Sequence, residues 1–388
     1  MPGVYVAYPF CAQKCTYCNF ASGVFPRELE SRYLEKLCAE ISETDWPWTP
    51  ETVYLGGGTP SQMDPCALAK LLSQVPGRKW AEATMEAAPG SLTPQKAKAW
   101  RSAGINRVSL GVQSFIAKEL SRTGRKHTAE TVVDDVGTLR AAGITNINLD
   151  LIAGLPFQTR ESWQESLSWI ERIGAPHVSV YMLEVDDDSN LGREILVLGS
   201  RYGAGAVPCE DDIADFYETA VERLRCLGIA RYEISNFARP GFESRHNLKY
   251  WNREPYLGFG ADAHSFDSVS RWQNPESASD YVAQRHALRS KTPADAASER
   301  FFLGLRLTEG IAGPFEPFSE TIRQFIRDGL LEQSGSRVRL TPRGVMVSNE
   351  VFQEFIGAGR KEDVTGPSPP LLSGFHIRGG TPTVMEGI

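Results

Sequence analysis

The chain has 388 residues, of which 41% are hydrophobic and 23% are charged, and its net charge is −7. This is the composition of an ordinary globular protein with room for a large core, in one large domain or two to three smaller ones. The negative charge argues against general nucleic-acid binding, which relies on a basic surface.

Neither a membrane span nor a signal peptide is predicted. No apolar run reaches the length that crosses a bilayer. The opening residues, MPGVYVAYPF, lack the basic start, the long apolar core and the cleavage site of a signal peptide. The sequence therefore predicts a cytoplasmic protein.

Short apolar runs alternate with amphipathic stretches up to about residue 240. The runs at 4–10, 52–58, 83–89, 107–115, 146–156, 177–185 and 231–238 are typical of strands. Helical spacing predicts helices at Glu28–Glu43, Pro65–Gln74, Pro94–Ala103, Ala129–Ala142 and Glu161–Ile173. Such alternation predicts a parallel sheet with crossover helices. Polar and glycine motifs at successive strand ends favour a barrel with one shared mouth, and an open sheet is the alternative.

The pattern changes after residue 240. Residues 241–275 are rich in Gly, Pro, Asn and aromatic residues and are predicted to form a long ordered loop and connection. Residues 276–358 are predicted to form a smaller, mainly helical domain with one hairpin, which resembles a winged helix. Because no basic stripe is present, we expect a packing role for this domain rather than DNA binding. Residues 359–388 are predicted to be a flexible tail.

Three of the seven cysteines, Cys11, Cys15 and Cys18, lie within eight residues. A tight cluster in a large chain indicates metal or redox chemistry rather than a disulfide framework. Structural zinc sites use four ligands, and no second Cys-x2-Cys pair exists here, so zinc would need a distant histidine. A four-iron cluster normally takes four cysteines, and three would leave one iron open for chemistry. The scattered Cys38, Cys66, Cys209 and Cys226 are predicted to be small buried hydrophobic residues.

The spacing Cys-x3-Cys-x2-Cys after the first strand resembles the radical S-adenosylmethionine superfamily. The resemblance implies a 4Fe-4S cluster whose open iron binds the amino and carboxylate groups of S-adenosylmethionine, which is cleaved to a 5′-deoxyadenosyl radical. It also implies an α/β fold, a partial TIM-type (β/α)6 barrel over residues 1–240. The run YLGGGTPSQ after the second predicted strand supports this, because glycines allow the backbone to approach a ligand closely.

The resemblance narrows to the oxygen-independent coproporphyrinogen III oxidases and their relatives. It rests on YPFCAQKCTYC, GGGTPS, MEAAPGSLT, GINRVSLGVQSF, LSRTGRKHTAE, NINLDLIAGLPFQT and YEISNFA, which stand in family order. The S-adenosylmethionine contacts that it implies are Tyr5, Tyr17, Gly57, Gly58, Thr59, Glu86, Gln113, Arg125 and Asp150. Acidic side chains can accept hydrogen bonds from ribose hydroxyls, and an arginine can pair with a carboxylate.

Two departures resemble one branch of this family, the HemW proteins, described as heme chaperones. True oxidases carry a fourth cysteine where this chain has Phe20, and they have a longer N-terminal extension than the ten residues before Cys11. The branch marker His-Asn-x-x-Tyr-Trp occurs at residues 246–251, and the resemblance makes His246 a candidate heme ligand. His264 is a second candidate by its proximity in sequence.

Three hypotheses follow. The first is a heme chaperone of the radical S-adenosylmethionine type that delivers heme to recipient hemoproteins. The second is an oxidase that decarboxylates coproporphyrinogen III to protoporphyrinogen IX. The third is a non-catalytic protein with zinc or a structural cluster at Cys11, Cys15 and Cys18. The implied partners are heme, heme-receiving proteins and an electron donor, without nucleic acid. Peripheral membrane contact, and a monomer or a cluster-dependent homodimer, are left open.

Overall fold

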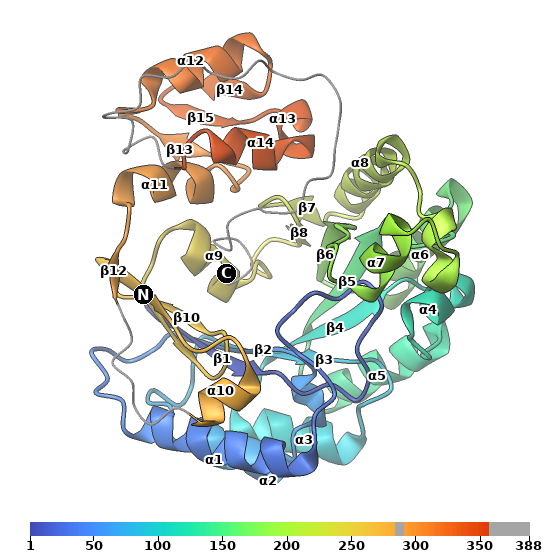
Figure 1. Ribbon diagram of the computed structural model, residues 1–388, viewed down its shortest axis with the longest axis vertical. Coiled ribbons are helices and arrows are strands. Elements are labelled where there is room, and N and C mark those ends of the chain that lie inside the picture. The colour runs from blue at the N-terminus through green and yellow to red at the C-terminus, as the bar shows by residue number, and fades with distance from the viewer. Residues whose placement is uncertain (284–290, 357–388) are drawn as a thin grey trace.

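The computed structural model describes residues 1–283 and 291–356, and its ribbon is shown in Figure 1. Within this part of the chain a large sheet has the strand order β12-β11-β10-β9-β1-β2-β3-β4-β5-β6-β8-β7. Strands β1 to β6 pair in parallel, each with the next along the chain. Their bounds are β1 (Gly3–Tyr8), β2 (Thr52–Gly57), β3 (Glu82–Ala87), β4 (Arg107–Gln113), β5 (Asn146–Ala153) and β6 (His177–Met182). The predicted α/β barrel of six parallel strands is confirmed.

Helices connect these strands and cover the outer face of the sheet (Figure 1). Their bounds are α1 (Arg27–Ser42), α2 (Pro65–Leu72), α3 (Pro94–Ala103), α4 (Ala117–Thr123), α5 (Ala129–Ala141), α6 (Arg160–Ile173), α7 (Asn190–Leu196) and α8 (Glu210–Cys226), with short 3-10 helices at η1 (Pro60–Gln62) and η2 (Arg201–Ala206). Local signals explain several ends. Thr128 and Thr159 form capping boxes at α5 and α6, and Gly174 ends α6 in the left-handed conformation. The five predicted helices are confirmed, with boundaries that differ by two residues at most.

The two faces of the barrel strands differ in polarity. Side chains directed at the helices are apolar and fully buried, as Val6, Leu55 and Leu149 illustrate. Alternate residues face the barrel interior, and many of these are polar. They include Tyr5, Tyr54, Thr84, Glu86, Ser109, Asn148, Asp150, Ser179 and Tyr181. The core therefore lies between sheet and helices, which leaves the barrel interior free to hold a polar site.

Both edges of the parallel sheet continue in ways that the sequence did not predict. Strand β8 (Asn236–Ala238) runs antiparallel to β6 and pairs with β7 (Ala230–Arg231), so the predicted seventh strand is a short return rather than another barrel strand. On the other edge, β9 (Tyr256–Phe259) pairs in parallel with β1. The prediction of a loop over 241–275 is wrong in local structure: it holds α9 (Arg245–Trp251), β9, β10 (His264–Phe266) and β11 (Ser270–Gln273).

The C-terminal region forms a smaller unit beside the barrel (Figure 1). After α10 (Ala278–Ala283) and β12 (Thr292–Pro293) come α11 (Ala296–Gly304), β13 (Ile311–Ala312), α12 (Ser319–Arg327), β14 (Leu331–Ser334), β15 (Arg337–Leu340), α13 (Pro342–Met346) and α14 (Ser348–Gln353). The predicted order of helix, hairpin and helix is confirmed, and a small sheet β13-β15-β14 supports it. Stacked Phe301 and Phe355, with Phe318 against both, form its centre. The predicted flexible tail, 359–388, lies outside the described residues.

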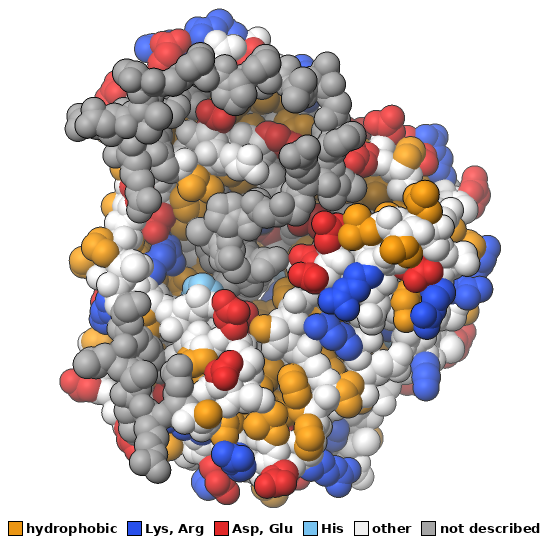
Figure 2. Space-filling model, viewed as in Figure 1, with side chains coloured by type: hydrophobic (Ala, Val, Ile, Leu, Met, Phe, Trp, Pro, Cys, Tyr) orange, Lys and Arg blue, Asp and Glu red, His pale blue; other side chains and the backbone are white. Residues whose placement is uncertain are grey.

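The surface carries charges of both signs. On the face shown in Figure 2, Lys and Arg side chains are interspersed with Asp and Glu over the described part of the barrel. No helix within residues 1–283 and 291–356 is long and apolar enough to cross a membrane.

Candidate functional site

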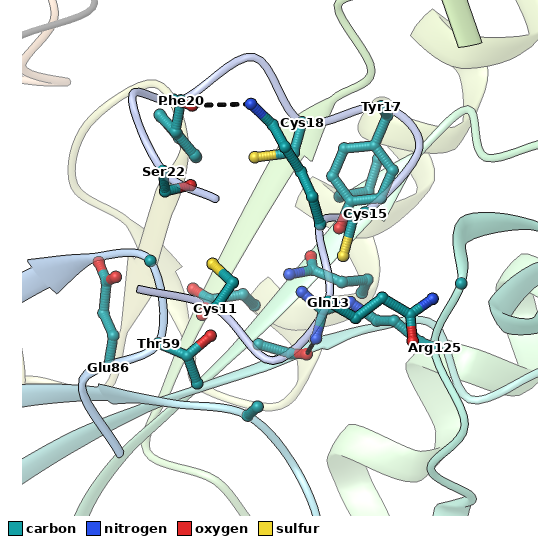
Figure 3. Close-up of a pocket in the computed structure, with 18 of the residues that line it drawn as sticks. Cys11, Gln13, Cys15, Tyr17, Cys18, Phe20, Ser22, Thr59, Glu86 and Arg125 are labelled. Atoms are coloured by element: carbon teal, nitrogen blue, oxygen red, sulfur yellow. Dashed lines mark hydrogen bonds between the residues drawn. The ribbon is translucent and has the colours of Figure 1, made fainter. Parts of the chain in front are cut away.

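The three clustered cysteines lie on the loop that follows β1, at the mouth of the barrel (Figure 3). Backbone hydrogen bonds anchor this loop at its base, from Cys11 to the Gly23 carbonyl at 2.8 Å and from Gly23 to the Pro9 carbonyl at 2.9 Å. Thr16, between the first two thiols and the third, donates to the Thr123 carbonyl at 3.3 Å. The loop is therefore held against the barrel from both its base and its tip.

Cys11, Cys15 and Cys18 are free thiols and are half-buried. Burial raises the pKa of the Cys18 thiol. Although all three line one cavity, no three His, Cys, Asp or Glu side chains of the described residues gather closely enough to hold a metal ion. Thiolates are the soft donors that iron–sulfur clusters take, so three of them on one cavity wall fit such a cluster. The three sulfur atoms would move closer together to bind it.

The scattered cysteines differ from the prediction. Cys38 is half-buried, but Cys66, Cys209 and Cys226 are exposed. The expectation that they are small buried hydrophobic residues is wrong for these three, because they lie at or near helix ends rather than on inward faces. None of them lines the cavity of the cysteine loop.

The glycine run after β2 lies directly against the start of the cysteine loop. Gly57 has a positive φ of 105°, and a Cβ on Gly58 would approach the Phe10 carbonyl oxygen to 2.7 Å. The Gly58 and Thr59 amides donate to the Tyr8 and Phe10 carbonyls at 2.8 and 2.9 Å. Only glycine allows this close approach of two backbones, so the run positions the cysteine loop.

Glu86, on β3, extends into the barrel mouth. Its carboxylate accepts hydrogen bonds from the Tyr54 hydroxyl at 2.9 Å and from the Gly57 amide at 3.2 Å. Burial raises the pKa of Glu86 to about 7, and the neighbouring charge of Asp150 raises it further. A carboxyl group held in this way can accept hydrogen bonds from a bound hydroxyl group.

Asp150, on β5, belongs to a hydrogen-bond network across three strands. The Asn148 amide donates to the Asp150 carboxylate at 2.7 Å, and the Ser109 hydroxyl donates to it at 3.0 Å. The Ser179 hydroxyl donates to Asn236 at 2.7 Å, which ties the return strand β8 to this network. Burial raises the pKa of Asp150. The network orients the carboxylate toward the barrel mouth.

Gln113 and Arg125 each place one polar atom without a partner among the described residues beside the cysteine loop. Gln113 ends β4 with a positive φ of 67°, a strained conformation for a residue with a Cβ. The Arg125 guanidinium donates to the Gly111 carbonyl at 2.7 Å and interacts electrostatically with Tyr17 and Cys15. The Gln113 Oε1 and Arg125 Nε atoms are buried and have no hydrogen bond within residues 1–283 and 291–356. Such groups are expected where a ligand supplies the missing partner.

These side chains line one cavity of about 500 Å³, here called the cluster chamber. The predicted site residues on its wall are Cys11, Cys15, Tyr17, Cys18, Gly57, Gly58, Thr59, Glu86, Gln113, Arg125 and Asp150. A second cavity of about 300 Å³, the aromatic chamber, holds Tyr5 and His246. Tyr54, Glu86, Tyr181 and Phe20 belong to both walls, so the two chambers adjoin.

Comparisons with known proteins show the family of this chain. A family model of the radical SAM superfamily matches residues 5–170, and one of the HemN C-terminal domain matches residues 292–347. The heme chaperone HemW of Bacillus subtilis is 33% identical over 383 residues, which cover 92% of this chain and 100% of that protein. The HemW of Mycobacterium tuberculosis H37Rv is 35% identical and covers 92% of this chain and 95% of that protein. This chain belongs to the HemW family. Coproporphyrinogen III oxidase HemN from Escherichia coli shares the fold, with a TM-score of 0.76 at 20% identity over 92% of this chain and 90% of that chain.

The motif of the HemW branch at residues 246–251 lies in helix α9, in which His246, Lys249 and Tyr250 are buried, rather than in the predicted loop. His246 is 1% exposed, and both of its ring nitrogens have partners. Nδ1 is 2.8 Å from the Thr52 hydroxyl, and Nε2 is 2.8 Å from the Tyr250 hydroxyl. Its ring also stacks on Tyr54 at 5.2 Å between centroids. In this arrangement His246 connects α9 to β2, and a role as heme ligand would require breaking a buried hydrogen bond.

Sequence reasoning missed two tyrosines that separate the chambers, Tyr54 on β2 and Tyr181 on β6. Tyr54 shares the alternating register of Gly56, and Tyr181 that of Ser179, so their inward direction was readable from the period of the strand. Their role was not, because tyrosine in a strand is ordinarily a packing residue.

Proposed function

We propose that this chain is a heme chaperone of the radical S-adenosylmethionine type, which binds a 4Fe-4S cluster, S-adenosylmethionine and heme and delivers heme to recipient hemoproteins in the cytoplasm. The proposal rests on HemW relatives whose matches cover 92% of this chain and on one observation of the structure. Three free thiols share a cavity with the glycine run and with the buried acidic, amide and guanidinium groups of Glu86, Asp150, Gln113 and Arg125.

The cluster chamber supplies suitable groups for both cofactors. Cys11, Cys15 and Cys18 would hold three irons, and a bound cluster supplies an open iron and an electron. The unpartnered Gln113 Oε1 and Arg125 Nε offer hydrogen bonds to the methionine end of S-adenosylmethionine. Glu86 and Asp150 offer acceptors for ribose hydroxyls, and Gly57 and Gly58 leave space beside the backbone. Tyr17 would pack against the cofactor, with Tyr5 behind Tyr54 at 6.1 Å between ring centroids.

The aromatic chamber suits a flat, largely apolar macrocycle. Its wall includes Tyr54, Tyr181, Tyr250, Trp251 and Tyr256. Aromatic faces pack well against such rings. Because the chamber shares residues with the cluster chamber, heme bound there would lie beside S-adenosylmethionine.

The main alternative is the oxidase reaction on coproporphyrinogen III, which the adjoining chambers and the HemN-like fold favour. The same cavities would then hold a porphyrinogen beside the cofactor. Phe20 occupies the position of the fourth cysteine of true oxidases, and it is 60% exposed on the wall of both chambers. The third hypothesis, a zinc or structural-cluster protein, would need a fourth ligand beside the three thiols, and the sequence has no second Cys-x2-Cys pair to supply one.

Anaerobic reconstitution with iron and sulfide tests the proposal. We expect a four-iron spectrum that changes on adding S-adenosylmethionine, saturable binding of hemin and no formation of protoporphyrinogen IX from coproporphyrinogen III. Zinc bound one to one without iron would support the third hypothesis. Sustained turnover of coproporphyrinogen III would refute the chaperone proposal in favour of the oxidase.

A further inference from the structure

The four described histidines differ in whether their ring nitrogens are available. His177 uses both nitrogens, with Asn148 at 2.6 Å and Tyr232 at 2.9 Å. His246 uses both, as described above. His127 donates from Nε2 to the Val112 carbonyl at 3.0 Å and lines the cluster chamber.

His264 is different. It lies on β10, opposite Gln273 of β11, and its imidazole lines the aromatic chamber. The ring makes no hydrogen bond with any described residue, although it is largely buried. Burial, with the nearby charge of Arg271, lowers the pKa of His264 to about 4. The imidazole is therefore neutral at neutral pH, which is the form that binds a metal ion.

Two charged groups of opposite sign, Arg306 and Glu233, lie on the same wall. Arg306, whose guanidinium lies 4.4 Å from the centre of the Trp251 ring, brings a positive charge from the C-terminal unit to the chamber. Glu233 is 1% exposed and interacts electrostatically with Arg306, and its Oε2 atom has no hydrogen bond with the described residues. This oxygen accepts hydrogen bonds and would pair with a donor of the ligand, so of the two groups only Arg306 suits a carboxylate. Guanidinium groups pair readily with carboxylates such as heme propionates.

From these observations we infer that His264, not His246, is the axial ligand of heme iron in the aromatic chamber, with Arg306 facing the propionates. This inference rests on the proposed heme-binding function and names its iron ligand. The alternative ligand, His246, would have to give up its hydrogen bond to Tyr250 and leave that buried hydroxyl without a partner, at a cost of about 1–3 kcal/mol. His264 gives up no such bond.

Hemin titration of the anaerobically reconstituted protein, followed by the Soret band and by electron paramagnetic resonance, tests the inference. For wild type we expect saturable binding with a histidine-ligated signature. For His264→Ala we expect a shifted Soret band and at least ten-fold weaker binding, with added imidazole restoring the signature. His246→Gln is the matched control, which should keep the wild-type Soret position. Circular dichroism and thermal unfolding show that each variant is folded.

The outcomes distinguish an error in the iron ligand from an error in the proposed heme-binding function. If wild type binds hemin saturably but His264→Ala keeps the spectrum and affinity, His264 is not the ligand, while the proposed function stands. The same conclusion follows if folded His246→Gln loses the histidine signature. If wild type shows no saturable binding of hemin, the proposed function fails and the inference fails with it.

Discussion

Replacing His246 by alanine should destabilise the fold rather than simply remove a ligand. The substitution leaves the hydroxyls of Thr52, 0% exposed, and Tyr250, 8% exposed, without their 2.8 Å partners. Each buried group left unpaired costs about 1–3 kcal/mol, and the cavity left by the ring adds about 1 kcal/mol or more. We therefore expect the free energy of unfolding to fall by about 3–7 kcal/mol, a large share of the about 5–15 kcal/mol of an ordinary domain.

Urea unfolding followed by circular dichroism at neutral pH measures this loss. His264→Ala is the matched control, because its imidazole makes no hydrogen bond with described residues, and we expect it to lose about 1 kcal/mol or less. The reasoning would be refuted if His246→Ala lost no more stability than His264→Ala. It would also fail if His246→Ala lost less than about 1 kcal/mol.

The pH dependence of stability gives a second view of His246. Burial lowers its pKa to about 3, and the charges of Lys249 and Arg107 add to this effect. Since the unfolded value is about 6.5, the stabilising contribution is complete above pH about 6.5 and is lost as the pH falls toward 3. Between about pH 6 and 4, wild type should therefore lose stability faster than His246→Gln, by up to about 1.4 kcal/mol per pH unit. Parallel curves would contradict this prediction.

Further predictions concern the cluster chamber. Gly58→Ala, whose Cβ would meet a backbone oxygen at 2.7 Å, should lower the free energy of unfolding by about 1–3 kcal/mol. The control Gly137→Ala in α5, where a Cβ has nothing within 4 Å, should raise it by about 0.5–1 kcal/mol. Equal effects of the two substitutions in urea unfolding would argue against close packing of the glycine run on the cysteine loop. Cys15→Ser should lose most of the iron bound after reconstitution, and Cys66→Ser, at an exposed thiol, should keep it; full iron in the first variant would exclude Cys15 as a ligand. Because the pKa of Glu86 is about 7, affinity for S-adenosylmethionine measured by calorimetry should rise from about pH 6 to 8 as the carboxylate ionises. Glu86→Gln should remove that rise. A rise that persists in Glu86→Gln would mean that another group titrates.

Local patterns in the sequence predicted much of the barrel and of the cluster chamber. The parallel strands end at one mouth, so residues after or near successive strand ends, such as Glu86, Gln113 and Asp150, were expected to converge, and they do line one cavity. The close packing of the glycine run on the cysteine loop also follows from glycine alone, because a Cβ at Gly58 has no room.

Long-range pairing and burial were not predictable in the same way. The run at 256–259 is too short to show that it pairs in parallel with β1, which extends the barrel sheet and brings His264 to the aromatic chamber. Likewise, the motif at His246 is rich in polar and aromatic residues, a pattern common to loops and buried helices. Only the packing of α9 on β2 shows that the imidazole is enclosed between Thr52, Tyr54 and Tyr250.

The central claim is that this chain carries heme rather than making its precursor. The most direct measurement is hemin titration of the anaerobically reconstituted protein in the presence of S-adenosylmethionine, with the optical spectrum recorded at each addition. The account predicts saturation at one heme per chain, with a Soret band typical of histidine ligation. A linear, unsaturable response with the spectrum of free hemin would contradict it.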